Sequence, residues 1–284
     1  MGRFQQQLMY RKYRKFSDDR WLKVLLDSIT GSAEVPMPGF PDAELQAGFV
    51  GHAGEHTIRE AWKFYSLMSD RRRKYGRPLT RKSQVLDFGC GWGRYARMFL
   101  RDVPAENIWC VDSWDLALTT CEQTGVPGRR VKIDQMPPSP LPAATFDTAF
   151  AYSVFSHLSP KAHVAWESEF ARVVKPGGLV FITTQGRWFL DICRDLREHP
   201  EKQVSLWHEM LATSFADYDA AAYDRGEMLY APNGGGPELD AEYYGDALVP
   251  REYFDEHWGD AFEILEFITD QSQFEQAVCV MRKR

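Results

Sequence analysis

Hydrophobic and polar positions follow a helical period in the first part of this chain. Leu22 and Leu25 belong to a run of apolar residues spaced for one face of an α-helix. Asp18 and Asp19 stand before that run, where helix N-caps belong, and Gly31 follows it as a stop signal. The pattern therefore predicts a first helix between the aspartates and the glycine.

A second and longer helix is expected after a stretch rich in proline and glycine. The pattern predicts it over residues 54–75, with Ile58, Trp62 and Tyr65 on one apolar face and Gly76 at its end. Residues 1–80 as a whole therefore read as a helical segment.

The pattern changes to alternating strands and helices over residues 83–184. Strands are predicted at 84–88, 108–112, 130–134, 148–152 and 179–183. Helices are predicted at 94–101, 115–123 and 160–174. Several strands are almost continuously apolar, as expected of parallel strands buried on both faces. This alternation predicts an α/β fold with a doubly wound, Rossmann-like sheet.

The last hundred residues are less regular. Amphipathic pieces around 188–197 and 204–218 predict a helical insertion after the fifth strand, and the glycine-rich stretch 233–237 suggests a mobile lid. Two closing strands are expected at 262–269 and 274–281. The short link between them permits only an antiparallel pair, so the sheet should be mostly parallel with an antiparallel last strand.

Composition and charge narrow the function classes. The chain has 284 residues, 44 % of them hydrophobic, a net charge of −6 and five cysteines without a Cys-x-x-Cys pair. Residues 181–284 carry 9 Lys or Arg against 21 Asp or Glu, which disfavours nucleic acid and other polyanions. No uncharged apolar run approaches the roughly 18 residues that span a bilayer. We expect a cytoplasmic protein without a membrane or nucleic-acid partner and without a metal site, and the oligomeric state stays open.

The segment from Val85 to Arg94, VLDFGCGWGR, is the most informative part of the sequence. A buried strand delivers Asp87, and glycines then let the backbone approach a ligand. Gly91 to Ala96 also satisfies the G-x-G-x-x-A pattern of dinucleotide sites. However, an acid ahead of the glycines repels a diphosphate and favours a cationic, amine-bearing ligand.

The run Asp87–Gly93 resembles motif I of the class I S-adenosylmethionine (SAM) methyltransferases. Three later segments resemble that family's motifs in the same order: WCVDSW at 109–114, FDTAFAYSVFSHL at 146–158 and RVVKPGG at 172–178. The proline-rich run 137–142 and the YSVFSHL segment resemble a bacterial subgroup that methylates small molecules and saccharides. The resemblance implies a Rossmann-like core and SAM as the cofactor, with S-adenosylhomocysteine as its product.

The resemblance also implies which residues meet the cofactor. The glycine-loop backbone should lie along the methionine part with Asp87 near its ammonium group, Asp112 should hold the ribose hydroxyls, and the residues after it should flank the adenine. The family's Gly-Asp-Ala at the third strand is here Asp-Gln-Met, which leaves open the side chain that reads the adenine amine. The predicted cofactor residues are Asp87, Gly89, Cys90, Gly91, Asp112, Ser113, Trp114, Asp134, Gln135, Met136 and Tyr152.

Catalysis and substrate choice are less specified. His157, just beyond the fourth strand, is the candidate general base, and the alternative is a structural imidazole hydrogen-bonded to a neighbouring loop. Tyr152, His157 and Trp188 are the predicted substrate-binding residues. His52 and His56 could close over the site from the N-terminal segment.

These observations predict four segments: an N-terminal helical segment covering the active site (1–80), a SAM-binding core (81–185), a substrate cap insertion (186–250) and closing strands of the core (251–284). The expected function is methyl transfer from SAM to an oxygen or nitrogen, or a carbon, of a small molecule such as a secondary metabolite or sugar. A non-catalytic partner or regulatory protein with the same fold is the alternative. An NAD(P)-dependent oxidoreductase is a weaker one.

Overall fold

The computed structural model describes residues 9–216, 220–234 and 240–284. Its helices are α2 (Asp18–Asp27), α3 (Ala43–Val50), α4 (Glu55–Tyr75), α5 (Asp115–Gln123), α6 (Pro160–Val173), α7 (Trp188–Glu198), α8 (Leu206–Thr213), α9 (Ala220–Asp224) and α10 (Arg251–His257). Its strands are β1 (Val85–Phe88), β2 (Ile108–Asp112), β3 (Arg129–Lys132), β4 (Phe146–Ala151), β5 (Val174–Thr184), β6 (Leu229–Ala231), β7 (Asp246–Leu248), β8 (Phe262–Ile268) and β9 (Ala277–Lys283).

A seven-stranded sheet in the order β3-β2-β1-β4-β5-β9-β8 forms the core of the fold. Strand β1 pairs in parallel with β2 and with β4, and β2 pairs in parallel with β3. Strand β9 runs antiparallel to β8, with a register shift between Ile264 and Glu266. The predicted Rossmann-like sheet with an antiparallel last strand is confirmed.

The chain divides into two compact units. The first comprises residues 1–134, 140–150 and 173–179, and the second comprises 135–139, 151–172 and 180–284. Strands β4 and β5 contribute residues to both.

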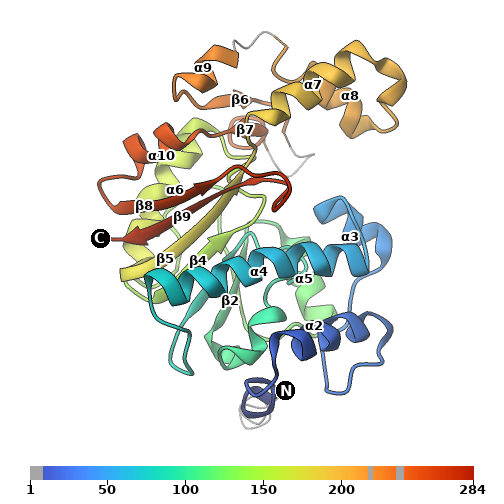
Figure 1. The fold of residues 1–284 in the computed structure, drawn as a ribbon, viewed down its shortest axis with the longest axis vertical. Helices are drawn as coiled ribbons and strands as arrows, with labels where there is room; N and C mark the ends of the chain where they lie inside the picture. Colours follow the sequence, from blue (N-terminus) through green and yellow to red (C-terminus); the bar gives the residue numbers. More distant parts are fainter. Residues whose placement is uncertain (1–8, 217–219, 235–239) are drawn as a thin grey trace. The chain divides into compact units, whose positions relative to one another are not determined.

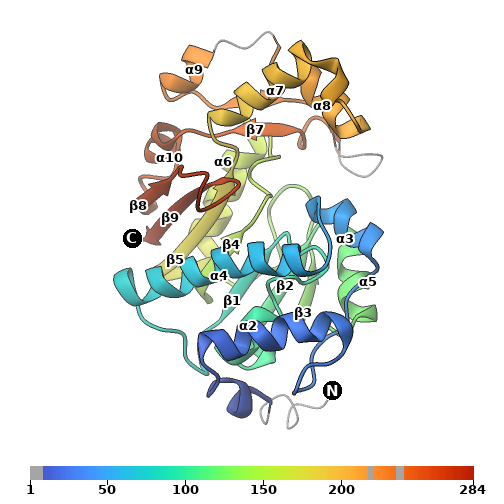
Figure 2. The same ribbon diagram turned by 45° about the vertical axis from the view of Figure 1, so that its right-hand side comes forward.

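In the first unit, α4 crosses one face of the strands β1 and β2 (Figure 1 and Figure 2). The α4 residues Phe64 and Tyr65 bury their rings against Phe150 and Phe99, at centroid distances of 6.3 and 5.3 Å. Tyr65 belongs to the predicted apolar face and Phe64 does not, and α4 begins and ends within one residue of the predicted range. The helix holds the N-terminal part of the chain on the strands that carry the glycine loop.

In the second unit, the helices α7–α9 and the small antiparallel sheet of β6 and β7 gather at one end, in the insertion that follows β5 (Figure 1 and Figure 2). Their shared core includes Phe189, Leu211 and Leu229. The predicted amphipathic helices are present, and the two short strands were not predicted. Of the glycine-rich stretch expected to form a lid, residues 235–237 lie outside the described residues.

Two local predictions were wrong. The first helix is capped by Ser17, whose side chain accepts from the Arg20 amide, and Asp18 and Asp19 form its first turn instead. The predicted helix at 94–101 is a series of turns that ends in a 3₁₀ helix at Met98–Arg101. The Met98 carbonyl there accepts a 2.9 Å hydrogen bond from the Trp21 indole. Contacts of this kind with residues far along the chain are not contained in the local helical pattern of the segment.

Candidate cofactor site and active site

The glycine loop follows β1 and is held by the backbone of β2. The amides of Gly89 and Cys90 donate to the carbonyl of Val111 at 2.8 and 3.1 Å. Gly91 and Gly93 adopt left-handed conformations, with φ of 51° and 75°. A Cβ at Gly93 would lie 2.7 Å from a methyl carbon of Val126, so packing as well as backbone conformation requires glycine there.

Asp112, at the end of β2, fixes the middle of that loop. Its Oδ2 accepts a 2.9 Å hydrogen bond from the Gly91 amide, and its Oδ1 accepts one of 2.9 Å from the Trp114 amide. Each carboxylate oxygen keeps a further lone pair for a ligand hydroxyl. Burial raises the pKa of Asp112, while these amides oppose the rise. Two predicted cofactor elements, the loop and the end of the second strand, are therefore joined by one carboxylate.

Asp87 lies under the same loop and is almost fully buried. Its Oδ2 has no hydrogen-bond partner among the residues that the structure describes. Burial, and next the nearby Asp112, raise the pKa of Asp87 to about 8, although Arg94 acts in the opposite direction. The Arg94 guanidinium already forms a 2.7 Å ion pair with Glu60. An unsatisfied buried carboxyl oxygen of this kind is suited to a cationic ligand.

The side chain of Cys90 lies on the buried side of the loop. Contact with Cys110 and Cys121, together with burial, raises the pKa of its thiol well above the usual value. The Cys121 thiol lies 3.2 Å from the carbonyl of Gly91. The thiol of Cys90 therefore packs with the other two thiols beneath the loop. The three-thiol cluster was not predicted, because its members come from three separate elements.

Three further residues of the first unit are predicted to contact the cofactor: Ser113 and Trp114, which follow β2, and Asp134, which follows β3. Ser113 and Trp114 are half-buried, and the Trp114 ring contacts that of Phe49 with a centroid distance of 4.8 Å. Asp134 is exposed and follows Ile133, whose amide donates to the Asp112 carbonyl at 3.1 Å. Phe49 was not predicted, since nothing in its local sequence indicates contact with a residue 65 positions away.

Gln135 and Met136 belong to the second unit and are both half-buried. The Gln135 carbonyl accepts a 3.0 Å hydrogen bond from the Trp166 indole on α6. This contact fixes the backbone after β3, and it does not identify which side chain reads the adenine.

Tyr152 stands at the carboxyl end of β4, beside a residue with unusual backbone geometry. Ser153 has a φ of 57°, a left-handed conformation that costs free energy for a residue other than glycine. The Ser153 amide donates to Thr183 Oγ1 at 2.7 Å, and the Gln276 amide group donates to Ser153 Oγ at 3.0 Å. Gln276 and Thr183, neither of them predicted, thus hold the turn that directly follows Tyr152.

His157 lies in the second unit with defined partners. Its Nδ1 is 2.8 Å from the Gly245 carbonyl, its ring stacks on Tyr244 at 4.9 Å, and Asp246 Oδ1 is 3.5 Å from Nδ1. A carbonyl oxygen can only accept, so Nδ1 carries the hydrogen and Nε2 of the neutral ring keeps a lone pair. These contacts are compatible with both predicted roles of the imidazole.

Trp188 begins α7 and is half-buried. A Cβ at Gly186 would lie 2.1 Å from the Trp188 ring, so the chain can turn beneath the indole only because residue 186 is glycine. The insertion thus presents this ring at the first residue of α7, four positions after the end of β5.

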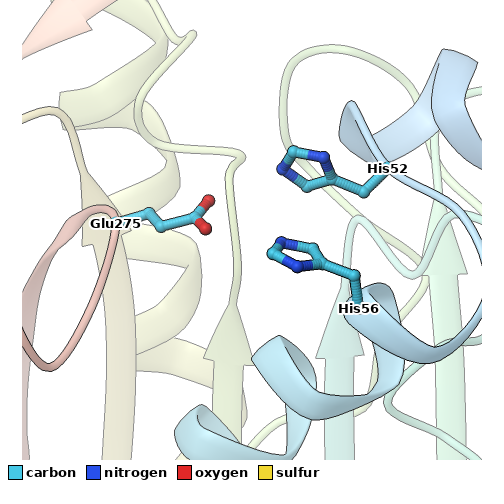
Figure 3. Close-up of side chains that lie close together, drawn as sticks. All are labelled: His52, His56 and Glu275. Carbon is cyan, nitrogen blue, oxygen red and sulfur yellow. The ribbon is translucent and has the colours of Figure 1, made fainter.

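His52 and His56 come from the loop before α4 and from its first turn. Their rings meet edge to face with a centroid distance of 4.4 Å, and Figure 3 shows both pointing the same way. Glu275, also labelled in Figure 3, belongs to the second unit.

Residues 85–178 match the model of a family described as a methyltransferase domain. A probable SAM-dependent methyltransferase of Mycolicibacterium smegmatis is 29 % identical over 182 residues, which cover 61 % of this chain and 66 % of that protein. The match thus spans slightly less than two thirds of the relative's length. Residues 85–178 of this chain are thus similar to a methyltransferase domain, and the relative that the chain resembles is a probable SAM-dependent methyltransferase.

Solved structures agree on the fold. A SAM-dependent methyltransferase from Anabaena variabilis has a TM-score of 0.53 and 11 % identity, covering 94 % of this chain and 95 % of that one. Another from Mesorhizobium loti has a TM-score of 0.51 and 12 % identity, covering 75 % of this chain and 96 % of that one. At such low identity these structures support the class I methyltransferase fold alone.

The methyltransferase domain uses SAM as its cofactor, and the residues of the first unit fit it. Asp87 offers a buried, unsatisfied carboxyl oxygen to a positive group, and Asp112 offers lone pairs to vicinal hydroxyls. Among the described residues, no helix is both long and apolar enough to cross a membrane.

Proposed function

We propose that this protein transfers a methyl group from SAM to an oxygen or nitrogen, or a carbon, of a small molecule such as a secondary metabolite or sugar. One observation carries the proposal: two buried carboxyl groups, Asp87 and Asp112, lie close together at a glycine loop. The nearby cation, Arg94, is engaged by Glu60. Such a loop attracts a ligand bearing an ammonium and a sulfonium.

The same charges argue against the dinucleotide alternative. A diphosphate at this loop would meet the Asp112 carboxylate at close range and would disfavour ionisation of Asp87, so its negative charge would be destabilised rather than neutralised. The G-x-G-x-x-A match therefore does not support an NAD(P)-dependent oxidoreductase. A non-catalytic role is disfavoured by the match to a methyltransferase domain across the whole glycine-loop segment.

The residue roles are proposals that rest on the family resemblance and on local contacts. Asp87 meets the ammonium group, and Asp112 accepts from the ribose hydroxyls. Ser113 and Trp114 flank the adenine, while Asp134, Gln135 and Met136 read its edge. Gly89, Cys90 and Gly91 present backbone rather than side chains, in agreement with the buried thiol of Cys90.

When bound, SAM supplies an electrophilic methyl group for an in-line displacement. The protein's contribution is to hold the acceptor in line and to exclude water, effects worth up to about 7–11 kcal/mol in well-oriented reactions. We propose that Tyr152 and Trp188 contact the acceptor. The hydrogen-bonded turn at Ser153 fixes the backbone next to Tyr152. The close approach of Gly186 to the indole fixes the backbone next to Trp188.

His157 is the proposed general base for an acceptor that must lose a proton. Its Nδ1–H donates to the Gly245 carbonyl, which leaves Nε2 as the atom that takes a proton. A neutral amine acceptor would not require this step.

The motif set suggests the bacterial subgroup that methylates small molecules and saccharides. We further propose that the protein acts in the cytoplasm, without a nucleic-acid or membrane partner. All five cysteines are free and buried, as suits a reducing compartment.

The direct experiment incubates the purified protein with SAM and pools of small metabolites. Mass spectrometry then follows S-adenosylhomocysteine formation and the gain of one methyl group. An acceptor-dependent appearance of both supports the proposal. Hydride exchange with NAD(P) in place of methyl transfer would contradict it.

A further inference from the structure

A short segment of the first unit forms a self-contained flap, residues 41–54, which we call the Pro41–Gly54 flap. It contains the helix α3, which is capped by Asp42, whose side chain accepts from the Leu45 amide at 2.7 Å. The helix ends at Gly51 in a left-handed conformation, with φ of 77°. The flap therefore contains a helix that is capped at both ends.

Gln46 ties the two ends of the flap together. Its amide nitrogen donates to the Pro41 carbonyl at 2.8 Å, and its amide oxygen accepts from the Gly54 amide at 3.0 Å. Gln46 is the only buried residue of α3. Since the flap buries little apolar side chain of its own, displacing it as one body costs little hydrophobic free energy.

The chain is anchored firmly on both sides of the flap. Before it, the Gly39 amide donates to the Thr124 carbonyl at 2.8 Å, and Arg97 donates to the Gly39 carbonyl at 3.1 Å. After it, Thr57 and Ile58 of α4 are fully buried. Any movement is therefore confined to the flap, with Gly54 at φ of 67° as a joint on the α4 side.

The flap places one aromatic ring on the cofactor loop. A Cβ placed on Gly91 would lie 3.4 Å from the Phe49 ring, and its three nearest atoms would all belong to that ring. The same ring contacts Trp114, with centroids 4.8 Å apart and an angle of 49° between the planes. Phe49 thus lies over the backbone that approaches the cofactor and against a residue proposed to flank the adenine.

We propose that Phe49 is a cofactor-binding residue carried by the Pro41–Gly54 flap. In this proposal the adenine stacks on the face of Trp114 that Phe49 covers. No third ring fits between two rings whose centroids lie 4.8 Å apart, so Phe49 moves from Trp114 and Gly91 before SAM enters. The flap then returns, and the ring packs on the bound cofactor and retards its release. This inference rests on the proposed function, because it takes the glycine loop as the SAM site.

Release kinetics test this inference. Stopped-flow tryptophan fluorescence measures binding and release of S-adenosylhomocysteine by three proteins: the wild type, the Phe49→Ala variant, and the Val50→Ala variant at the adjacent residue. Val50 lies on the same helix and is also half-buried, so it serves as the matched control. We expect Phe49→Ala to release the product about tenfold faster, as loss of one ring contact predicts. Val50→Ala should stay within about twofold of the wild type.

Hydrogen–deuterium exchange provides a readout that needs no variant. The amides of residues 43–50 should exchange more slowly in the wild type once S-adenosylhomocysteine is bound. If the wild type binds normally but its exchange is unchanged on binding, the role of Phe49 is overturned. Equal release rates for the two variants would overturn it as well. Either result would leave the proposed function intact. If the wild type binds neither SAM nor its product, the proposed function fails and the inference fails with it.

Discussion

The amide of Gly91 donates a 2.9 Å hydrogen bond to Oδ2 of Asp112, and this contact joins the loop after the first strand to the end of the second. The other oxygen of the same carboxylate accepts from Trp114. One side chain therefore shapes the glycine loop and the start of the segment proposed to flank the adenine. Changes at Asp112 should affect folding and cofactor binding together.

Replacing Asp112 with Ala should weaken SAM binding about 100-fold, since charge-assisted hydrogen bonds to the ribose hydroxyls are lost. The unfolding free energy should fall by about 1–3 kcal/mol, because two amides lose their acceptor. Calorimetric titration and urea unfolding measure the two effects. Asp115→Ala is the control, since Asp115 is exposed and pairs only at the surface with Lys132. Undiminished affinity in Asp112→Ala would remove the proposed role of this residue.

SAM affinity should rise with pH between 6 and 8, because the pKa of Asp87 is raised to about 8 and a positive ligand requires its ionised form. The limiting slope is about tenfold per pH unit, and binding at pH 7 should release a proton. Titrations in buffers of different ionisation enthalpy detect that proton. Asp87→Asn should bind weakly at every pH and release none.

Asp87 should also lower the stability of the free protein as pH rises. Its pKa is higher in the folded than in the unfolded state, so the unfolded chain binds fewer protons between about pH 4 and 8 and gains in relative stability there. Asp87→Asn should therefore be more stable than the wild type at pH 8. A pH-independent affinity of the wild type would contradict the assignment.

Gly93→Ala should destabilise the protein by about 2–4 kcal/mol, from a strained left-handed residue and a Cβ that overlaps Val126. Gly125→Ala is a matched control, since Gly125 has a similar φ of 71° but open space around it, and should cost only about 1 kcal/mol. Urea unfolding of both variants isolates the contribution of packing. Equal costs would show that the close contact at Gly93 has no energetic weight.

His157→Asn should separate the two roles of the imidazole. The asparagine amide nitrogen is bonded to Cγ, as Nδ1 is, so it can still donate to the Gly245 carbonyl, but it cannot take a proton. If His157 is the base, kcat should fall about 10²–10⁴-fold while SAM affinity and the melting temperature stay close to wild type. The exposed His199→Asn serves as a control. A wild-type rate in His157→Asn, with lost stability in His157→Ala, would assign a structural role.

The sheet was predictable because its signal is local. Parallel strands buried on both faces read as short apolar runs, and Asp87 and Asp112 stand at the ends of two of them. Since the carboxyl ends of parallel strands meet at one edge of a sheet, the positions of both aspartates agree with the single site that the family resemblance implies.

Other features depend on contacts between distant residues. The segment 94–101 has a helical pattern, but the buried Arg97 reaches the Gly39 carbonyl and the Trp21 indole takes the Met98 carbonyl. The strands β6 and β7 have three residues each, too few for a periodic signal. Phe49 was missed for the same reason, because its partners at Gly91 and Trp114 lie far along the chain.

The central claim is that a glycine loop with two buried carboxyl groups receives a sulfonium cofactor. Isothermal titration of the wild type with SAM, S-adenosylhomocysteine, NAD and NADP at pH 8 tests it most directly. The account predicts saturable one-site binding of SAM and its product and no heat from either dinucleotide. Binding of NAD or NADP, with none of SAM, would contradict it.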